Sequence, residues 1–394
     1  MPLKYSTTLA VCEVPYLPLT QPTFTADHYT APTVYSMLTA PLSGEESVYV
    51  YDLLKLRQLY RSWTKMMPNI TPYYAIKCNP NPRVLQCLAE MGSSFDCASP
   101  AEIKAVLTTG VDSERIIYAN PCKKESDISY AQSLNVTKTT FDSICELEKI
   151  MRIAPETQLI LRIYAADPTA LCALSNKYGA FKEEWESILQ RAAELSANVC
   201  GVSFHVGSGA RDTSVYKSAI HQCCEFQKVA TKYGFDIKLL DIGGGFTYET
   251  LPAIAKSIAE CKSELACFSD VIAEPGRYFA ERIATLLTKV VGYKKRINGT
   301  MDYWLTDGLY GSFNCSIYDH TIMTPIPLEN TNSSCVQSTL WGPTCDGFDK
   351  VGVYNLPILK YGSWLVWENA GAYTVAGACD FNGINFTQPV CIYL

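Results

Sequence analysis

Short apolar runs alternate with amphipathic stretches from about residue 70 to residue 285. Each apolar run has the length of a buried strand, and the segments between them repeat apolar residues at helical spacing. The predicted strands are residues 73–78, 94–98, 116–120, 139–142, 159–164, 202–206, 239–243 and 271–274. Eight strands that alternate with helices predict a closed parallel (β/α)8 barrel of the TIM type, in the α/β class.

The sequence pattern changes after residue 285. Short β-rich runs, such as residues 303–306 and 363–367, lie between Gly, Pro and Asn turns, and the first 50 residues also have β character. We therefore predict a barrel domain at residues 53–284. A second, all-β domain is expected to combine residues 1–52 with residues 285–394.

Composition and charge narrow the class of protein. The chain has no apolar run of about 18 residues and no signal-peptide pattern at its start. Its 17 cysteines are scattered without a C-x-x-C pair, and only four histidines are present, which favours reduced thiols and no metal site. The net charge of −6 without a basic block argues against nucleic acid and fits a small cationic substrate. We expect a globular cytoplasmic protein that does not bind membranes.

Polar or glycine residues stand at the C-terminal ends of the predicted strands, where barrels of this type build their active sites. A lysine desolvated there has a lowered pKa and can form Schiff bases, although alone it is more often a lysine that reaches solvent. Glycines and an arginine in the last two loops suit one phosphate, and they do not fit the dinucleotide pattern G-x-G-x-x-G. Together these features imply pyridoxal 5′-phosphate. The strand-end residues are Lys77, Asp96, Asn120, Asp142, Arg162, His205, Gly243, Gly244, Gly245, Glu274, Gly276 and Arg277.

Longer motifs occur in a fixed order over nearly the whole chain. They are YAIKCN (74–79), FDCAS (95–99), IYANPCK (117–123), GVSFHVGSG (201–209), EPGRY (274–278), YDH (318–320), WGPTCDG (341–347) and ENAGAYT (368–374). In these motifs the chain resembles the eukaryotic-type ornithine decarboxylases, a family with the alanine racemase-like barrel.

This resemblance implies roles for the cofactor residues. Lys77 would hold pyridoxal phosphate as a Schiff base, His205 would stack on its ring, and Glu274 would keep its pyridine nitrogen protonated. Asp96 and Arg162 would lie on the side of the ring hydroxyl. The phosphate would be surrounded by Ser208, Gly243, Gly244, Gly245, Gly276, Arg277 and Tyr373.

The resemblance also implies a homodimer whose active sites are shared between subunits. Cys345 and Asp346 would reach into the site of the partner subunit, where Cys345 controls protonation of the substrate α-carbon. Asp346 and Asp319 would bind the distal ammonium of the substrate, and Tyr318 and Phe381 are further substrate positions. Taken alone, Cys345 would be one buried thiol among many, and Phe381 would be core.

The expected reaction is decarboxylation of L-ornithine to putrescine and CO₂, a carboxy-lyase step of polyamine biosynthesis. The same chemistry on L-lysine or L-arginine stays open, because one methylene changes binding by only about 1–3 kcal/mol. Phe348 and Lys350 replace the usual leucine and arginine of the family, which also affects substrate choice. A non-catalytic homologue of the antizyme-inhibitor type is disfavoured, because the catalytic positions are present. Whether an antizyme-like regulator binds residues 121–148 is open.

Overall fold

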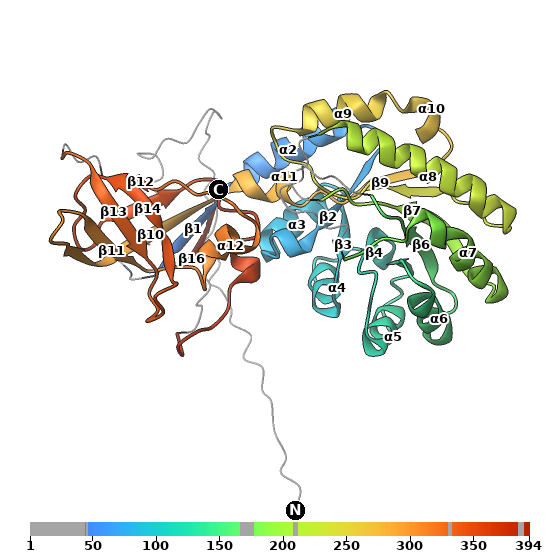
Figure 1. The fold of residues 1–394 in the computed structure, drawn as a ribbon, viewed down its shortest axis with the longest axis horizontal. Helices are drawn as coiled ribbons and strands as arrows, with labels where there is room; N and C mark the ends of the chain where they lie inside the picture. The colour runs from blue at the N-terminus through green and yellow to red at the C-terminus, as the bar shows by residue number, and fades with distance from the viewer. Residues whose placement is uncertain (1–43, 45, 166–176, 208–211, 330–332, 385–389) are drawn as a thin grey trace, which may run out of the picture.

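The computed structural model describes residues 44, 46–165, 177–207, 212–329, 333–384 and 390–394. A closed barrel and a separate β-sheet lie side by side, at the right and the left of Figure 1. Two of the sequence expectations fall outside the described residues, namely the placement of residues 1–43 and the phosphate role of Ser208.

The barrel is built from parallel strands, as the sequence predicts. Each strand pairs with the next, and the last pairs with the first, so that the sheet closes on itself. The strands are β2 (Thr71–Ala75), β3 (Ser94–Cys97), β4 (Ile116–Tyr118), β5 (Lys138–Phe141), β6 (Gln158–Arg162), β7 (Asn198–Ser203), β8 (Leu239–Asp241) and β9 (Asp270–Ala273). The predicted fold class is confirmed, and all the strands direct their C-terminal ends to the same face.

Helices alternate with these strands and cover the outside of the barrel (Figure 1). Ser99 is the N-cap of the helix that begins at Pro100: its hydroxyl accepts a hydrogen bond from the Glu102 amide at 3.3 Å, and the Glu102 carboxylate accepts from the Ala98 amide at 2.5 Å. No helix in the described ranges is long and apolar enough to cross a membrane. The helices of this part are α2 (Leu53–Met66), α3 (Pro82–Glu90), α4 (Pro100–Leu107), α5 (Glu125–Ser133), α6 (Ile144–Ile153), α7 (Trp185–Glu194), α8 (Ser214–Lys232), α9 (Leu251–Ala259), α10 (Lys262–Leu265) and α11 (Arg277–Ala280).

The first predicted strand ends earlier than expected. The sequence predicts a strand over residues 73–78, but β2 ends at Ala75, and Ile76–Cys78 form a 3₁₀ turn, η2. The cause lies in Asn79, whose side-chain oxygen accepts from the Asn81 amide at 3.0 Å while its amide group donates to the Gly371 carbonyl at 2.7 Å. These bonds fix the turn that follows, so Lys77 projects from a turn rather than from a strand.

The β-rich part draws its strands from both ends of the described chain. Strand β1, blue in Figure 1, pairs antiparallel with β10 and parallel with β16, and the sheet continues in the order β12-β15-β10-β11-β13-β14. Its elements are β1 (Val48–Tyr51), β10 (Ala284–Lys295), β11 (Met301–Leu305), α12 (Cys315–Tyr318), β12 (Ile326–Pro327), β13 (Val336–Trp341), β14 (Lys350–Leu356), β15 (Trp364–Trp367) and β16 (Val390–Tyr393).

The segment that follows β15 ties the β-rich part to the barrel next to Lys77. The Tyr373 amide donates to the Cys78 carbonyl at 2.9 Å, and the Gly371 amide donates to the Glu281 carbonyl at 3.1 Å. Gly371 is needed there, because a Cβ atom would overlap the carbonyl oxygen of Ala280. The turn that carries Lys77 is therefore held from both parts of the chain.

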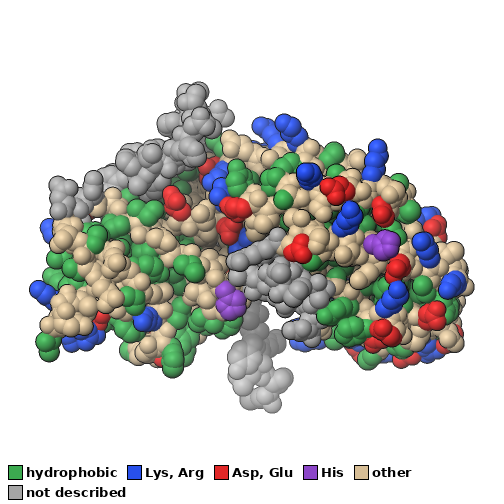
Figure 2. Space-filling model, turned by 45° about the horizontal axis from the view of Figure 1, so that its top comes forward, with side chains coloured by type: hydrophobic (Ala, Val, Ile, Leu, Met, Phe, Trp, Pro, Cys, Tyr) green, Lys and Arg blue, Asp and Glu red, His purple; other side chains and the backbone are tan. Residues whose placement is uncertain are grey.

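The surface is unevenly charged. On the face shown in Figure 2, Lys and Arg side chains are interspersed with Asp and Glu over the barrel, and hydrophobic and uncharged side chains are more prominent over the β-rich part. Large hydrophobic side chains of the β-rich part, such as Ile322, Phe348 and Tyr318, are more than half exposed.

Replacing Gly371 by alanine is expected to destabilise the protein. The new methyl group has no room against the Ala280 carbonyl, so the backbone around residue 371 must shift away from the barrel, at a cost of about 1–3 kcal/mol. Thermal unfolding should show a lower midpoint for Gly371→Ala than for Gly292→Ala, where the nearest atom to an added Cβ is 3.8 Å away. Equal midpoints for the two variants would show that the contact between Gly371 and Ala280 is not rigid.

Candidate active site

Lys77 and Asp96 form an ion pair at the C-terminal face of the barrel. The Lys77 Nζ atom lies 2.9 Å from Asp96 Oδ2, and Asp96 is buried while the Lys77 side chain is 41% exposed. Burial alone lowers the pKa of Lys77, but the charges of Asp96 and Glu274 outweigh this effect and raise its pKa above the ordinary value. The expectation of a lowered pKa is therefore wrong for this arrangement, in which Lys77 is a charged ammonium.

Two buried carboxyl groups, Asp241 and Glu274, lie together at the ends of β8 and β9. Asp241 accepts a hydrogen bond from the Gly243 amide at 2.9 Å. Burial raises the pKa of Asp241 to about 7. Burial, together with the charges of Asp241 and Asp96, raises the pKa of Glu274 well above its usual range. A cationic group bound beside this pair would favour the charged forms of both carboxyl groups.

His205 is a neutral ring in this environment. Its Nδ1 atom accepts a hydrogen bond from the Gly207 amide at 3.0 Å. Burial and the positive charges of Arg162 and Lys77 hold the pKa of His205 well below its usual range. A flat, uncharged imidazole is suited to stacking against an aromatic ring.

The glycines at 243–245 let the backbone pass close to His205. Gly243 and Gly245 have positive φ values of 64° and 102°. A Cβ atom on Gly244 would lie 2.9 Å from His205 Nε2 and 2.8 Å from the Glu274 carbonyl oxygen. The turn therefore requires glycine, and it forms a cradle without side chains of the kind that binds phosphate.

Arg277 is held by two acidic side chains, Asp319 and Glu281. Its Nη2 atom lies 2.5 and 2.6 Å from the two carboxylate oxygens of Asp319, and its Nη1 atom lies 3.0 Å from Glu281. The guanidinium also lies over the ring of Tyr373, 5.3 Å from its centroid. Gly276 is required next to it, because a Cβ there would lie 2.9 Å from Cys78 Cβ. Asp319, predicted for substrate binding, is thus a buried partner of Arg277.

Cys345, Asp346 and Phe381 form a second group in the β-rich part. The Cys345 amide donates to the Asn382 side chain at 3.1 Å, and the Asp346 carboxylate accepts a short hydrogen bond from the Tyr310 hydroxyl. That bond lowers the pKa of Asp346. The Tyr310 ring stacks on Phe381 with centroids 4.1 Å apart and planes 5° apart. Cys345 is exposed, so it is not the buried thiol that the residue taken alone would suggest.

Sequence reasoning missed two residues of these groups. Tyr310 holds both Asp346 and Phe381, and no sequence pattern singles it out. Asp241 ends an apolar strand, and a carboxylate at that position in a parallel barrel is a usable signal. Among the remaining predicted residues, Arg162 lies over the Tyr178 ring, with 5.5 Å from Cζ to the centroid, and Tyr318 is 75% exposed.

The family follows from comparison with known proteins. Residues 53–281 match the family model described as the pyridoxal-binding domain of pyridoxal-dependent decarboxylases. This chain belongs to the pyridoxal-dependent decarboxylases. It is 44% identical over 373 residues to the chloroplastic ornithine decarboxylase of Nicotiana glutinosa, with 90% of this chain and 86% of the relative covered. Its identity to the ornithine decarboxylase of Mus musculus is 40% over 375 residues, with 89% and 81% covered.

Solved structures of decarboxylases share the fold. The arginine decarboxylase of Paramecium bursaria Chlorella virus superposes with a TM-score of 0.89 at 36% identity, covering 93% of this chain and 100% of the other. The lysine/ornithine decarboxylase of Vibrio vulnificus complexed with putrescine gives a TM-score of 0.84 at 30% identity, with 93% and 99% covered. The family has pyridoxal phosphate as its cofactor, as the sequence motifs imply.

The residues at the barrel mouth fit pyridoxal phosphate. Asp96 Oδ1 and Ser203 Oγ are buried without a hydrogen-bond partner in the described part of the chain, so polar atoms are left for a ligand. The Asp241–Glu274 pair suits a protonated ring nitrogen, and the glycine turn with Arg277 suits the phosphate. The described residues contain no group of three His, Cys, Asp or Glu side chains that could hold a metal ion.

Replacing Lys77 by alanine is expected to remove both the visible absorbance of the bound cofactor and turnover. We expect a loss of at least about a thousandfold in kcat, because no other amine replaces the lysine nucleophile. The matched control is Lys104→Ala, which removes an exposed lysine on α4. If Lys77→Ala kept the absorbance and turned over within about tenfold of the parent, the assignment of Lys77 would be wrong.

Proposed function

We propose that the chain decarboxylates L-ornithine to putrescine and CO₂, with the barrel mouth as its reaction centre. The observation that carries this proposal is the Lys77–Asp96 ion pair of 2.9 Å, beside a buried acidic pair and a neutral histidine. The ornithine decarboxylases of tobacco species, yeast and mouse, 40 to 44% identical to this chain, support the choice of substrate.

Each residue of the centre has a defined task in this proposal. When bound, pyridoxal phosphate supplies an electron sink for the carbon that loses CO₂. Lys77 would hold the cofactor at its aldehyde carbon, and Asp96 orients the Lys77 amine. The Asp241–Glu274 pair would keep a proton on the ring nitrogen, because two buried carboxyl groups are stabilised by that positive charge. His205 would stack on the cofactor ring without adding a charge.

The distal end of the substrate is a cation, and carboxylates are its natural partners. Asp346 is the best candidate, because its pKa is lowered by Tyr310 and it is charged at neutral pH. Asp319 adds negative charge but is already engaged by Arg277 and by the Thr321 hydroxyl at 2.6 Å. Lysine and arginine remain alternative substrates, because the structural relatives include an arginine decarboxylase and a lysine/ornithine decarboxylase.

We further propose that the active site is shared between two copies of the chain. Cys345 is exposed and Asp346 is partly exposed, on a loop of the β-rich part, and in the family resemblance they serve the partner's barrel. In this proposal residues 53–284 are the cofactor-binding unit, and residues 1–52 with 285–394 supply the loop. Cys345 would then protonate the α-carbon, and Phe381 and Tyr318 would line the pocket.

Location and regulation are also proposed. We place the protein in the cytoplasm, since the cysteines that the structure describes are free. Residues 121–148, which include α5 (Glu125–Ser133), are the candidate contact for an antizyme-like regulator.

Substrate choice can be measured directly. We expect purified protein with added pyridoxal phosphate to release CO₂ from L-ornithine with a kcat/KM at least about tenfold above that for L-lysine or L-arginine, because one methylene is worth about 1–3 kcal/mol. Preference for another amino acid would support decarboxylation but would show that L-ornithine is not the main substrate. No turnover on any of them, without cofactor absorbance, would reject the enzyme assignment.

A shared site predicts complementation between inactive variants. Mixing Cys345→Ala with Lys77→Ala should restore activity, up to about a quarter of the parent value, because half of the random dimers contain one intact site. The control is each variant alone, taken through the same dissociation and reassociation. If labelled subunits exchange and activity does not recover, the site is not shared.

A further inference from the structure

Tyr216 is a buried aromatic residue whose hydroxyl group reaches the glycine turn at residues 243–245. It lies on α8 and is 0% exposed. Its hydroxyl donates a hydrogen bond of 2.8 Å to the carbonyl of Gly244, 28 positions further along the chain. The turn is thus bonded to a helix that lies outside it.

The Tyr216 ring is held in place by other aromatic residues. It stacks on Phe246, with centroids 5.4 Å apart, and meets Phe204 edge-on at 6.3 Å. Phe246 is itself buried and packs edge-on against Trp63 at 5.1 Å. A hydroxyl group on a ring packed in this way has little freedom, so the core sets its position relative to the turn.

The glycine turn needs a constraint of this kind, because it has no side chains of its own. Gly243 and Gly245 have positive φ values of 64° and 102°, and glycine adopts positive values about as readily as negative ones. The peptide group between Gly244 and Gly245 has glycine on both sides, so its rotation meets little steric resistance. The bond from Tyr216 to the Gly244 carbonyl therefore favours one orientation among several.

The orientation of this peptide group decides which of its polar atoms a ligand meets. The C=O and N–H groups of a trans peptide point in opposite directions. The Gly244 carbonyl points to Tyr216 on α8, which covers the outside of the barrel (Figure 1), so the Gly245 amide points away from α8. That amide donates to no carbonyl group in the described ranges. A free N–H group attracts an anion, whereas a carbonyl in its place would repel one.

We propose that Tyr216 is a positioning residue for the phosphate of the cofactor, because its hydroxyl holds the Gly244–Gly245 peptide with the amide toward that phosphate. This inference rests on the proposed function through the cofactor alone, and it holds for any amino-acid substrate. The close fit at Gly245 supports it. A Cβ atom there would lie 2.7 Å from the Tyr216 hydroxyl oxygen and 2.6 Å from the Gly207 carbonyl oxygen.

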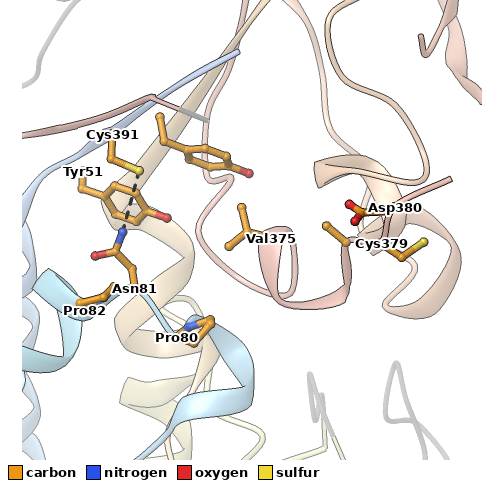
Figure 3. A pocket seen from close by; sticks show the side chains of 10 residues that line it. Tyr51, Pro80, Asn81, Pro82, Val375, Cys379, Asp380 and Cys391 are labelled. Atoms are coloured by element: carbon orange, nitrogen blue, oxygen red, sulfur yellow. Dashed lines mark hydrogen bonds between the residues drawn. The ribbon is translucent and has the colours of Figure 1, made fainter. Parts of the chain in front are cut away.

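A cavity at the other side of the Lys77 turn offers no comparable place for a phosphate. This cavity, of about 400 Å³, is shown in Figure 3, where the Asn81 side chain points to Cys391, its hydrogen-bond partner. Among the described residues that line the cavity there is no Lys or Arg, whereas Asp380 is acidic. No residue of the glycine turn lines it. A ligand bound there would therefore not respond to a change at Tyr216.

The test compares two ligands that differ only in the phosphate ester, pyridoxal phosphate and pyridoxal. Each is titrated into the full-length protein after dialysis to remove bound cofactor, and binding is followed by absorbance. In Tyr216→Phe, which removes only the hydroxyl, one buried hydrogen bond to the turn is lost. We expect the Kd for pyridoxal phosphate to rise about tenfold and the Kd for pyridoxal to stay within about twofold of the parent.

The matched control is Tyr354→Phe. The Tyr354 hydroxyl donates to the Met323 carbonyl at 3.1 Å, so this variant loses a bond of the same kind in the β-rich part. Its ratio of the two dissociation constants should equal that of the parent. If Tyr216→Phe weakened both ligands by the same factor, the role of the hydroxyl would be structural only, and the proposal would be overturned.

Hydrogen exchange in the holoenzyme gives a readout that does not depend on affinity. Peptides that cover residues 240–247 should exchange faster in Tyr216→Phe than in the parent, because the Gly244–Gly245 peptide is no longer held. The same peptides should exchange at the parent rate in Tyr354→Phe. Equal exchange in all three proteins would also contradict the proposal. Neither measurement uses an amino-acid substrate, so CO₂ release from L-ornithine reports separately on the proposed function.

Discussion

The structure depends on how negative charge is buried at the barrel mouth. Asp96, Asp241 and Glu274 are all buried there, and the burial of carboxylates is costly unless a positive group lies close by. Lys77 supplies part of that compensation, through a contact of 2.9 Å with Asp96. The Asp241–Glu274 pair instead has raised pKa values, because burial disfavours the charged carboxylates. A protonated cofactor ring would relieve this constraint, so in the proposed function the same charges that are costly to bury would help to bind the cofactor.

The position of Lys77 depends in turn on contacts that are distant in sequence. Asn79 is bonded to the Gly371 carbonyl, and Cys78 is bonded to the Tyr373 amide. The segment after β15 therefore holds the turn of Lys77 in place through hydrogen bonds. The Tyr373 ring also lies against the Arg277 guanidinium, so one loop of the β-rich part contacts both the turn of Lys77 and Arg277. The two parts of the chain form one site in this sense, even before a second copy is considered.

Much of the barrel and its site follows from local sequence pattern. Strand and helix periodicities predict the closed barrel, since each strand is buried by its own apolar run and each helix by its own apolar face. Residues at strand ends, such as Asp96 and His205, are then placed by the common direction of the strands. The turn at Lys77 was not predictable, because Asn79 is held by a residue almost 300 positions away. The charge state of Lys77 and the role of Tyr310 were missed for the same reason, since each depends on contacts between elements that are distant in sequence.

The hydrogen bonds of the Asp319 carboxylate are relevant to how the chain would select its substrate. Both oxygens of Asp319 accept hydrogen bonds from Arg277, and one also accepts from the Thr321 hydroxyl, so these contacts fix the position of Asp319. A carboxylate held in this way adds charge but cannot move to follow a longer or shorter side chain. Asp346 instead lies on an exposed loop, where its carboxylate accepts hydrogen bonds from the Tyr310 hydroxyl and from the Phe348 amide at 3.0 Å. In the proposed function, the loop of Asp346 and Phe348 would set the length of the pocket, and substrate choice would differ through that loop without disturbing the buried charges of the barrel.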